Sequence, residues 1–391
     1  MLSSVELSVI GAVAAALFAA AVVAFITTPV VRSLAFKIGA VDVPRDNRRM
    51  HNHPIPRMGG LAIFFGFILS ALIFIPLTPP LRGMLLGAVI IVILGIFDDI
   101  YALPAMTKFL IQILAALIAV LMGNRIDILS NPNIFSSDPY WVLGWLSIPI
   151  SVIWIVGITN AVNLIDGLDG LACGVSTISS MTMLVIALTV AEPEVALLMA
   201  ALSGGCIGFL PYNLNPAKIF MGDTGSTFLG FILAVVSIQG LFKSYAIISF
   251  AVPFLMLGLP IFDTCFAIFR RVSHGQSPMA PDRGHIHHRL IDMGFSQKQA
   301  VAVLYVISAI LGLSAVVLTT TSVLKAMMVL LALCVAGGLS AKLYLDRVNH
   351  REPPESPAQD GAPARPRKLR QPPGDVAGND YFFGEEERSD K

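Results

Sequence analysis

The stretch "WVLGWLSIPISVIWIVGITNAVNLIDGLDG", residues 141–170, contains the pattern that decides the fold. Its apolar part, from Trp141 to Ile158, approaches the length of about 20 residues that a helix needs to cross a bilayer. Three polar residues follow directly, at intervals of three: Asn163, Asp166 and Asp169. Because carboxylates at the end of a membrane segment are unfavourable, we expect these acids to have a functional role.

The apolar pattern recurs along most of the chain. Of its 391 residues, 55% are hydrophobic and 13% are charged, with a mean hydropathy of +0.78, whereas a soluble domain carries about 25% charged residues. The sequence therefore predicts an all-α polytopic membrane protein with about eleven transmembrane helices. The apolar runs lie near residues 6–31, 58–77, 84–99, 108–123, 141–160, 171–190, 195–212, 227–242, 246–269, 299–319 and 323–343.

The distribution of basic residues predicts the orientation of these spans. The loops on one side hold 13 Lys and Arg residues against 4 on the other, or 22 against 4 with the tail included. The positive-inside rule then puts the N-terminus outside and the C-terminus in the cytoplasm. We expect residues 1–346 to form the membrane domain. Residues 347–391, rich in Pro, Gly and charge, are expected to form a disordered tail.

The acidic clusters and the histidines that precede the tail lie at or next to the predicted cytoplasmic face. This distribution predicts one active site assembled from several cytoplasmic loops. A transporter, the main alternative class, would need polar groups at the midplane, where this sequence offers little besides Asp263. The residues on the cytoplasmic face are Asp98, Asp99, Asp166, Asp169, Asp223, His285, His287 and His288.

The segment "GIFDDIYALP", residues 95–104, places Asp98 and Asp99 at the end of an apolar helix. Carboxylates there are opposed by the helix dipole, so a compensating cation is expected. That cation is either Mg²⁺ or a basic side chain, for which Lys108 is the candidate.

Two further acidic segments contain glycines. Asn163, Asp166 and Asp169 would form one strip on a helix, but the glycines among them favour a turn. In "NPAKIFMGDTGS", Asp223 precedes an apolar helix whose first N–H groups can bind an anion. A carboxylate beside such a helix start is typical of a Mg²⁺–phosphate site. The alternative there is a helix cap by Thr224 or Ser226.

The histidines of "PDRGHIHHRL" lie between Arg283 and Arg289. A histidine cluster can bind zinc, but the arginines would repel a cation, so the segment fits a polyanion such as a nucleotide diphosphate better. Asp263 is expected either to be functional or to pair with a nearby arginine such as Arg270. The first cytoplasmic loop adds basic residues that orient the chain or meet a lipid phosphate: Arg45, Arg48, Arg49, His51, His53 and Arg57. The four cysteines lie in apolar runs and read as packing residues.

Acids, a metal, a basic phosphate-binding segment and a membrane location together indicate phosphoryl transfer with one lipid reactant. At this point a resemblance adds detail. The ordered motifs "RMGGLAIF", "GIFDDIYALPAMTKFLIQ", "NAVNLIDGLDGLACG", "NPAKIFMGDTGS" and "PDRGHIHHRL" make the chain similar to the polyprenyl-phosphate N-acetylhexosamine-1-phosphate transferases. They resemble most the bacterial branch that begins O-antigen, enterobacterial common antigen and teichoic acid synthesis.

The resemblance implies transfer of GlcNAc-1-phosphate from UDP-GlcNAc to polyprenyl (undecaprenyl) phosphate, with release of UMP. It implies a catalytic role for Asp98, Asp99, Asp166 and Asp169. Substrate binding is implied for Asn163, Arg283, His285, His287 and His288, and we expect Lys108, the candidate cation beside the aspartates, to bind substrate with them. It implies Mg²⁺, replaceable by Mn²⁺, on Asp223. The reaction would take place at the cytoplasmic face of a bacterial cytoplasmic membrane, without nucleic acid and with a homodimer as a possible assembly. The pattern "HIHH" favours the GlcNAc branch over the alternative, phospho-N-acetylmuramoyl-pentapeptide transfer.

Overall fold

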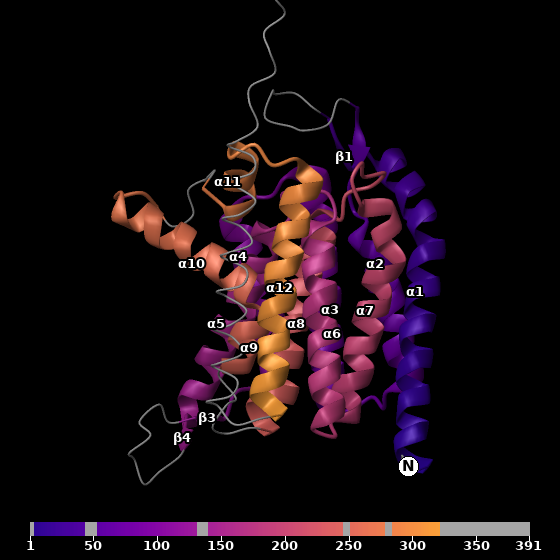
Figure 1. Ribbon diagram of the computed structural model, residues 1–391, viewed down its shortest axis with the longest axis vertical. Helices are drawn as coiled ribbons and strands as arrows, with labels where there is room; N and C mark the ends of the chain where they lie inside the picture. The colour runs from indigo at the N-terminus through magenta and orange to yellow at the C-terminus, as the bar shows by residue number, and fades with distance from the viewer. Residues whose placement is uncertain (1–3, 44–52, 131–139, 245–250, 278–283, 321–391) are drawn as a thin grey trace, which may run out of the picture. The chain divides into compact units, whose positions relative to one another are not determined.

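The structure is a computed structural model that describes residues 4–43, 53–130, 140–244, 251–277 and 284–320. The all-α membrane class is confirmed (Figure 1). The helices are α1 (Ser4–Ile38), α2 (Gly60–Phe74), α3 (Pro79–Tyr101), α4 (Ala105–Leu121), α5 (Ser147–Leu164), α6 (Leu171–Thr189), α7 (Pro193–Asn213), α8 (Gly222–Ser244), α9 (Ala251–Met256), α10 (Gly258–Ser273), α11 (Ile286–Asp292) and α12 (Gln297–Thr320). Two antiparallel pairs of short strands join them: β1 (Val41–Asp42) with β2 (Ile55–Pro56), and β3 (Ile128–Ser130) with β4 (Tyr140–Val142).

Most predicted spans correspond to helices in the described part of the chain. Six helices are long and apolar enough to cross a membrane: α1, α3, α5, α6, α7 and α12. Helices α2 and α4 are apolar but shorter, with 15 and 17 residues. The predicted span at 323–343, Cys334 and the predicted tail at 347–391 lie outside the described residues. The total of eleven spans and the orientation therefore stay predictions.

The described part of the predicted span at 246–269, residues 251–269, is not one continuous helix. The chain forms α9 and α10, with Leu257 between them in a turn. Pro260 has no N–H to donate to the carbonyl of Met256, which weakens a continuous helix at this point. In Figure 1, α10 leaves the direction of the neighbouring helices and points away from them. Its large apolar side chains Phe262 and Phe269 are exposed in the protein.

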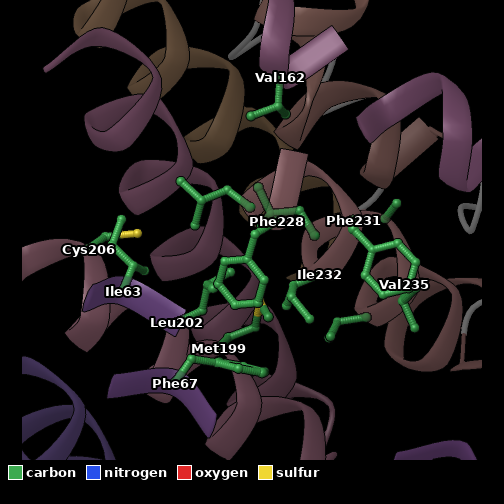
Figure 2. Close-up of a cluster of buried hydrophobic side chains, with 14 of the residues drawn as sticks. Ile63, Phe67, Val162, Met199, Leu202, Cys206, Phe228, Phe231, Ile232 and Val235 are labelled. Atoms are coloured by element: carbon green, nitrogen blue, oxygen red, sulfur yellow. The ribbon is translucent and has the colours of Figure 1, made fainter. Parts of the chain in front are cut away.

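Helix α8 lies at the centre of the apolar core. Nearly all its side chains from Thr224 to Ile238 are buried, because α2, α3, α5 and α7 all pack against it. Figure 2 shows Phe228 of α8 beside Phe67 of α2, Met199 and Leu202 of α7. The rings of Phe67 and Phe228 meet edge to face with centroids 5.6 Å apart. This packing fixes the start of α8, where Asp223 lies.

The two ends of the bundle carry different connections. Figure 1 shows β1 and α11 at one end, and β3, β4 and the start of α1 at the other. The residue Phe220, just before α8, donates its N–H to the carbonyl of Pro56 in β2, and Asp99 at the end of α3 accepts the N–H of Asp223. The end of α3 and the start of α8 therefore lie at the same end as β1 and α11, with the predicted site residues on or beside them. The strand pair β1–β2 closes the first loop there, with Val41 opposite Pro56.

Candidate active site

Glycines let three helix ends meet at the site. A Cβ on Gly60, at the start of α2, would lie 1.9 Å from the Cα of Gly225 on α8. A Cβ on Gly95, near the end of α3, would lie 2.3 Å from the Cα of Thr224. The backbone N–H of Gly60 also donates to the carbonyl of Met221 at 2.9 Å. The start of α8 is therefore held in direct backbone contact with both α2 and α3.

Asp99 caps α8 from the end of α3. Its carboxylate accepts the backbone N–H groups of Asp223 at 2.9 Å and Thr224 at 3.1 Å, and the Thr224 hydroxyl at 2.7 Å. Gly222 leaves room for it, because a Cβ there would lie 2.4 Å from Oδ2. The negative charge lies at the favourable, positive end of the α8 dipole. Asp99 thus takes the capping role that the sequence suggested for Thr224 or Ser226, and it pairs two N–H groups that we expected an external anion to use.

Lys108 joins Asp98 to Asp223. Its Nζ donates to Asp98 Oδ2 and to Asp223 Oδ2, both at 2.9 Å. The other oxygen of Asp98 accepts the backbone N–H of Leu103 at 2.8 Å. The predicted compensation of Asp98 by Lys108 is confirmed. Asp98 is 9% exposed at its side chain and Asp223 28%, so a ligand has more access to Asp223.

The segment that contains Asp166 forms a turn rather than a helical strip. Helix α5 ends at Leu164, and the N–H of Asp166 donates to the carbonyl of Asn163 at 3.1 Å. The side chain of Asn163 donates to the hydroxyl of Ser226 on α8 at 2.8 Å. This contact ties the turn to the start of the central helix.

Asp166 faces the same group of carboxylates. Burial raises its pKa to about 8, and the negative charges of Asp223 and Asp99 contribute to this rise. The positive charge of Arg57 acts in the opposite direction. An isolated aspartic acid has a pKa near 3.9, so the rise reflects mainly the burial of this carboxyl, to which the neighbouring carboxylates add.

Asp169 lies apart from this cluster in its contacts. Its Oδ2 accepts the side-chain amide of Asn215 at 2.9 Å and the N–H of Ala217 at 3.0 Å. Asn215 also donates to Gln297 Oε1 at 2.7 Å, at the start of α12. These bonds hold the segment that leads into Asp223, which is a positioning role. The catalytic role predicted for Asp169 stays a prediction.

The histidine segment contacts the acidic turn. A Cβ on Gly167 would lie 2.2 Å from Nε2 of His287, so the ring packs directly against the turn. Burial and, to a lesser extent, the charge of neighbouring His288 lower the pKa of His287 to about 4. The ring of His287 lies 4.3 Å from that of His288, centroid to centroid. Arg283, the remaining predicted substrate-binding residue, lies outside the described residues.

Asp263 is buried and pairs with His285 rather than with Arg270, the partner that the sequence suggested. His285 Nδ1 lies 2.8 Å from Asp263 Oδ2. Arg270, the expected partner, donates to the carbonyl of Gly284 at 2.9 Å. Among the described residues, no group of three or more His, Cys, Asp or Glu side chains is arranged as a metal site.

Arg57 is a residue of the site that the sequence analysis left among the orienting charges. It forms an ion pair with Asp42 at 3.2 Å, across the β1–β2 pair, and its charge acts on Asp166. Its position two residues before the close-packed Gly59 and Gly60 was the available signal. The other arginines of that loop, Arg45, Arg48 and Arg49, and His51 lie outside the described residues.

Comparison with known proteins identifies the family. A sequence model of glycosyl transferase family 4 matches residues 81–241. A probable undecaprenyl-phosphate N-acetylglucosaminyl 1-phosphate transferase of Bacillus subtilis is 46% identical over 79% of this chain and 86% of its own length. The chain belongs to glycosyl transferase family 4.

Other members of glycosyl transferase family 4 are similar over much of the chain. A decaprenyl-phosphate N-acetylglucosaminephosphotransferase of Mycolicibacterium smegmatis is 34% identical over 73% of this chain and 77% of its own. A phospho-N-acetylmuramoyl-pentapeptide-transferase of Staphylococcus aureus is 32% identical over 66% of this chain and 83% of its own. The family match extends from α3 to α8, which includes Asp98, Lys108, Asp166 and Asp223.

Proposed function

We propose that this protein transfers GlcNAc-1-phosphate from UDP-GlcNAc to undecaprenyl phosphate and releases UMP. The observation that carries the proposal is the meeting of Asp98 and Asp223 at Lys108, at one end of an apolar helix bundle and beside the turn that holds Asp166. The names of the relatives from Bacillus subtilis and Mycolicibacterium smegmatis support the same sugar phosphate and a polyprenyl phosphate acceptor. The product, a polyprenyl-diphospho-GlcNAc, would begin a cell-surface polysaccharide.

In the proposed reaction, an oxygen of the lipid phosphate bonds to the β-phosphorus of UDP-GlcNAc. The bond from that phosphorus to the bridging oxygen breaks, and the electron pair leaves with UMP. A phosphate whose second pKa is near 6 is largely a dianion at neutral pH, so little base catalysis is needed. Such transfers depend mainly on positioning and charge neutralisation. Lys108 supplies a positive charge, and Asp98 orients it through the bond at 2.9 Å.

We propose Mg²⁺ as the cofactor, with Mn²⁺ as a substitute. The donors at the site are carboxylate oxygens, which suit this hard cation. Mg²⁺ usually binds one or two carboxylates together with substrate phosphates and water, so it needs no cage made of protein alone. Asp223, the more accessible carboxylate, and Asp166 would hold it. When bound, the ion would neutralise charge on the phosphates.

The proposed location is the cytoplasmic face of a bacterial cytoplasmic membrane, because the loops on this side hold most of the basic residues. Two outcomes compete with the proposal. The muramoyl-pentapeptide relative from Staphylococcus aureus makes a different sugar donor the first alternative. Transport of a lipid-linked sugar is the second alternative. We also propose that the protein forms a homodimer, which does not affect the chemistry.

The test is a donor panel with purified protein in detergent. We expect lipid product with UDP-GlcNAc and undecaprenyl phosphate, in the presence of Mg²⁺. Product only with UDP-GalNAc or UDP-MurNAc-pentapeptide would keep the chemistry but overturn the sugar. No lipid product with any donor would overturn the proposed function and favour transport.

A further inference from the structure

The carboxylate of Asp263, which lies outside the group formed by Asp98, Asp166 and Asp223, binds the histidine segment. Asp263 lies on α10 and is 2% exposed. Its Oδ2 lies 2.8 Å from His285 Nδ1, and its Oδ1 accepts the backbone N–H of Ile286 at 2.8 Å. A buried carboxylate needs such partners to be tolerated. Both of these partners belong to the start of α11, so the two hydrogen bonds of this carboxylate hold that segment.

Arg270 holds the same segment at the preceding residue. It lies seven positions after Asp263 on α10, which puts both on one face of the helix. Its Nη1 donates to the carbonyl of Gly284 at 2.9 Å. A Cβ on Gly284 would lie 1.9 Å from Arg270 Nη2, so the guanidinium fills the space beside that glycine. Three consecutive residues, Gly284 to Ile286, are thus fixed to one face of α10.

Helix α11 needs this support because it is short. It has seven residues, from Ile286 to Asp292, and a helix of that length is unstable alone. His285 is its N-cap residue, but the His285 side chain makes no capping bond. Asp263 supplies that cap from another helix, through the N–H of Ile286.

We propose that Asp263 and Arg270 form a clamp, the α10 clamp, that positions His285 for the phosphate groups of the substrate. The inference rests on the proposed function, and Asp263 acts in it as a positioning residue through His285. Because a carboxylate only accepts hydrogen bonds, the proton lies on Nδ1 of His285, and Nε2 faces away from the clamp.

The clamp also reaches the acidic turn. The rings of His285 and His287 lie nearly parallel, with centroids 5.8 Å apart and planes 10° apart. His287 in turn packs against Gly167, the residue after Asp166. A loss of the clamp therefore frees His285 and loosens the packing beside the carboxylate cluster.

The first test is a double-mutant cycle on kcat/KM for UDP-GlcNAc. We expect Asp263→Asn and His285→Ala each to lower kcat/KM by at least about tenfold, which is the scale of one lost hydrogen bond to a charged group. Since Asp263 acts through His285, the double variant should lie within about twofold of His285→Ala. Asp292→Asn, an exposed acid on the same short helix, is the control and should stay within about twofold of the wild type. Multiplicative losses in the double variant would overturn the proposal.

The second test does not depend on turnover. Nitrogen NMR of ¹⁵N-histidine-labelled protein reports which ring nitrogen carries the proton, and the His285→Ala spectrum identifies the signal of His285. We expect the proton of His285 on Nδ1 in the wild type and a different pattern in Asp263→Ala. A His285 signal that is the same in both proteins would overturn the clamp. If the wild type makes no lipid product from any donor, the proposed function fails while this test of the clamp still stands.

Discussion

The capping of α8 by Asp99 makes a sharp prediction for Thr224→Val. The substitution replaces the hydroxyl that donates to Asp99 Oδ2 at 2.7 Å with a methyl group of similar size. Thr224 is 0% exposed, so water does not take the place of the lost donor. A hydrogen bond to a charged group contributes about 1.5–3 kcal/mol, and we expect a loss of about 2 kcal/mol in the free energy of unfolding.

The loss of this hydrogen bond should also lower the rate of the reaction. Asp99 accepts the backbone N–H of Asp223 as well, so a looser cap moves the carboxylate that bonds to Lys108. A misplacement of 1 Å in an active site can reduce turnover about 100-fold, and a smaller shift should reduce kcat by about tenfold. Thr224→Ser keeps the hydroxyl and is the matched control, expected to remain near the wild type in both measurements.

The assay is denaturant unfolding in micelles together with initial rates of lipid product formation. Asp99→Asn serves as the second arm, because it puts an amide N–H₂ where a carboxylate oxygen now accepts two hydrogen bonds. We expect it to lower stability and turnover together. If Asp99→Asn abolished turnover at full stability, while Thr224→Val changed neither, Asp99 would act on the substrate directly and the capping account would be wrong.

Three further predictions test other parts of the site. Gly95→Ala forces a methyl group against the backbone of α8 and should lower the free energy of unfolding by at least about 1–3 kcal/mol in the same assay. Gly157→Ala is the control, because a Cβ at Gly157 meets only open space. Equal effects of the two substitutions would refute the close contact between Gly95 and Thr224. The pKa of His287 is lowered from 6.5 to about 4, so the unfolded chain binds a proton on this side chain at a higher pH than the folded protein does. Between pH 6.5 and 4 the wild type should therefore lose about 3 kcal/mol in its free energy of unfolding, and His287→Gln should not show this loss. Curves of unfolding free energy against pH that run parallel for the two proteins would contradict this. Asp223→Asn should lower Mg²⁺-dependent turnover at least about 100-fold. Asp127→Asn, which changes an exposed acid that pairs with Arg125 away from the site, should leave turnover unchanged. A Mg²⁺ titration of Asp223→Asn that matches the wild type would refute the metal role of Asp223.

Local electrostatics was enough to predict part of the site. Asp98 at the end of a helix needs a cation, and the basic residue one turn into the next helix supplies it. The glycines around Asp166 indicated a turn, which the structure has between α5 and α6. Both inferences use residues close together in the chain, where the geometry follows from the helix period and from glycine itself.

Contacts between distant segments could not be predicted in this way. Asp99 and Asp98 are adjacent and look equivalent, yet one caps α8, 124 residues further along, and the other binds Lys108. Asp169 repeats the spacing of Asp166 but turns to Asn215 instead. Which partner an acid finds depends on how the helices pack, and a single sequence does not contain that information directly.

The break between α9 and α10 had a local signal that the apolar run concealed. Pro260 lies within that run, and hydropathy alone counts it as part of one span. The break changes the direction of α10 and brings Asp263 to His285, which a straight helix of the same residues would not have indicated. Backbone chemistry was the better guide here than the average hydropathy of the run.

The central claim is that the β-phosphate travels with the sugar. UDP-GlcNAc labelled with ³²P in its β-phosphate tests this most directly, in a reaction with undecaprenyl phosphate and Mg²⁺. We predict that the label appears in the lipid, as a diphosphate, in equal amount to released UMP. Label that stays in the nucleotide, as UDP, would mean that the bond to the sugar carbon breaks instead, and it would contradict the account given for Lys108 and the carboxylates around it.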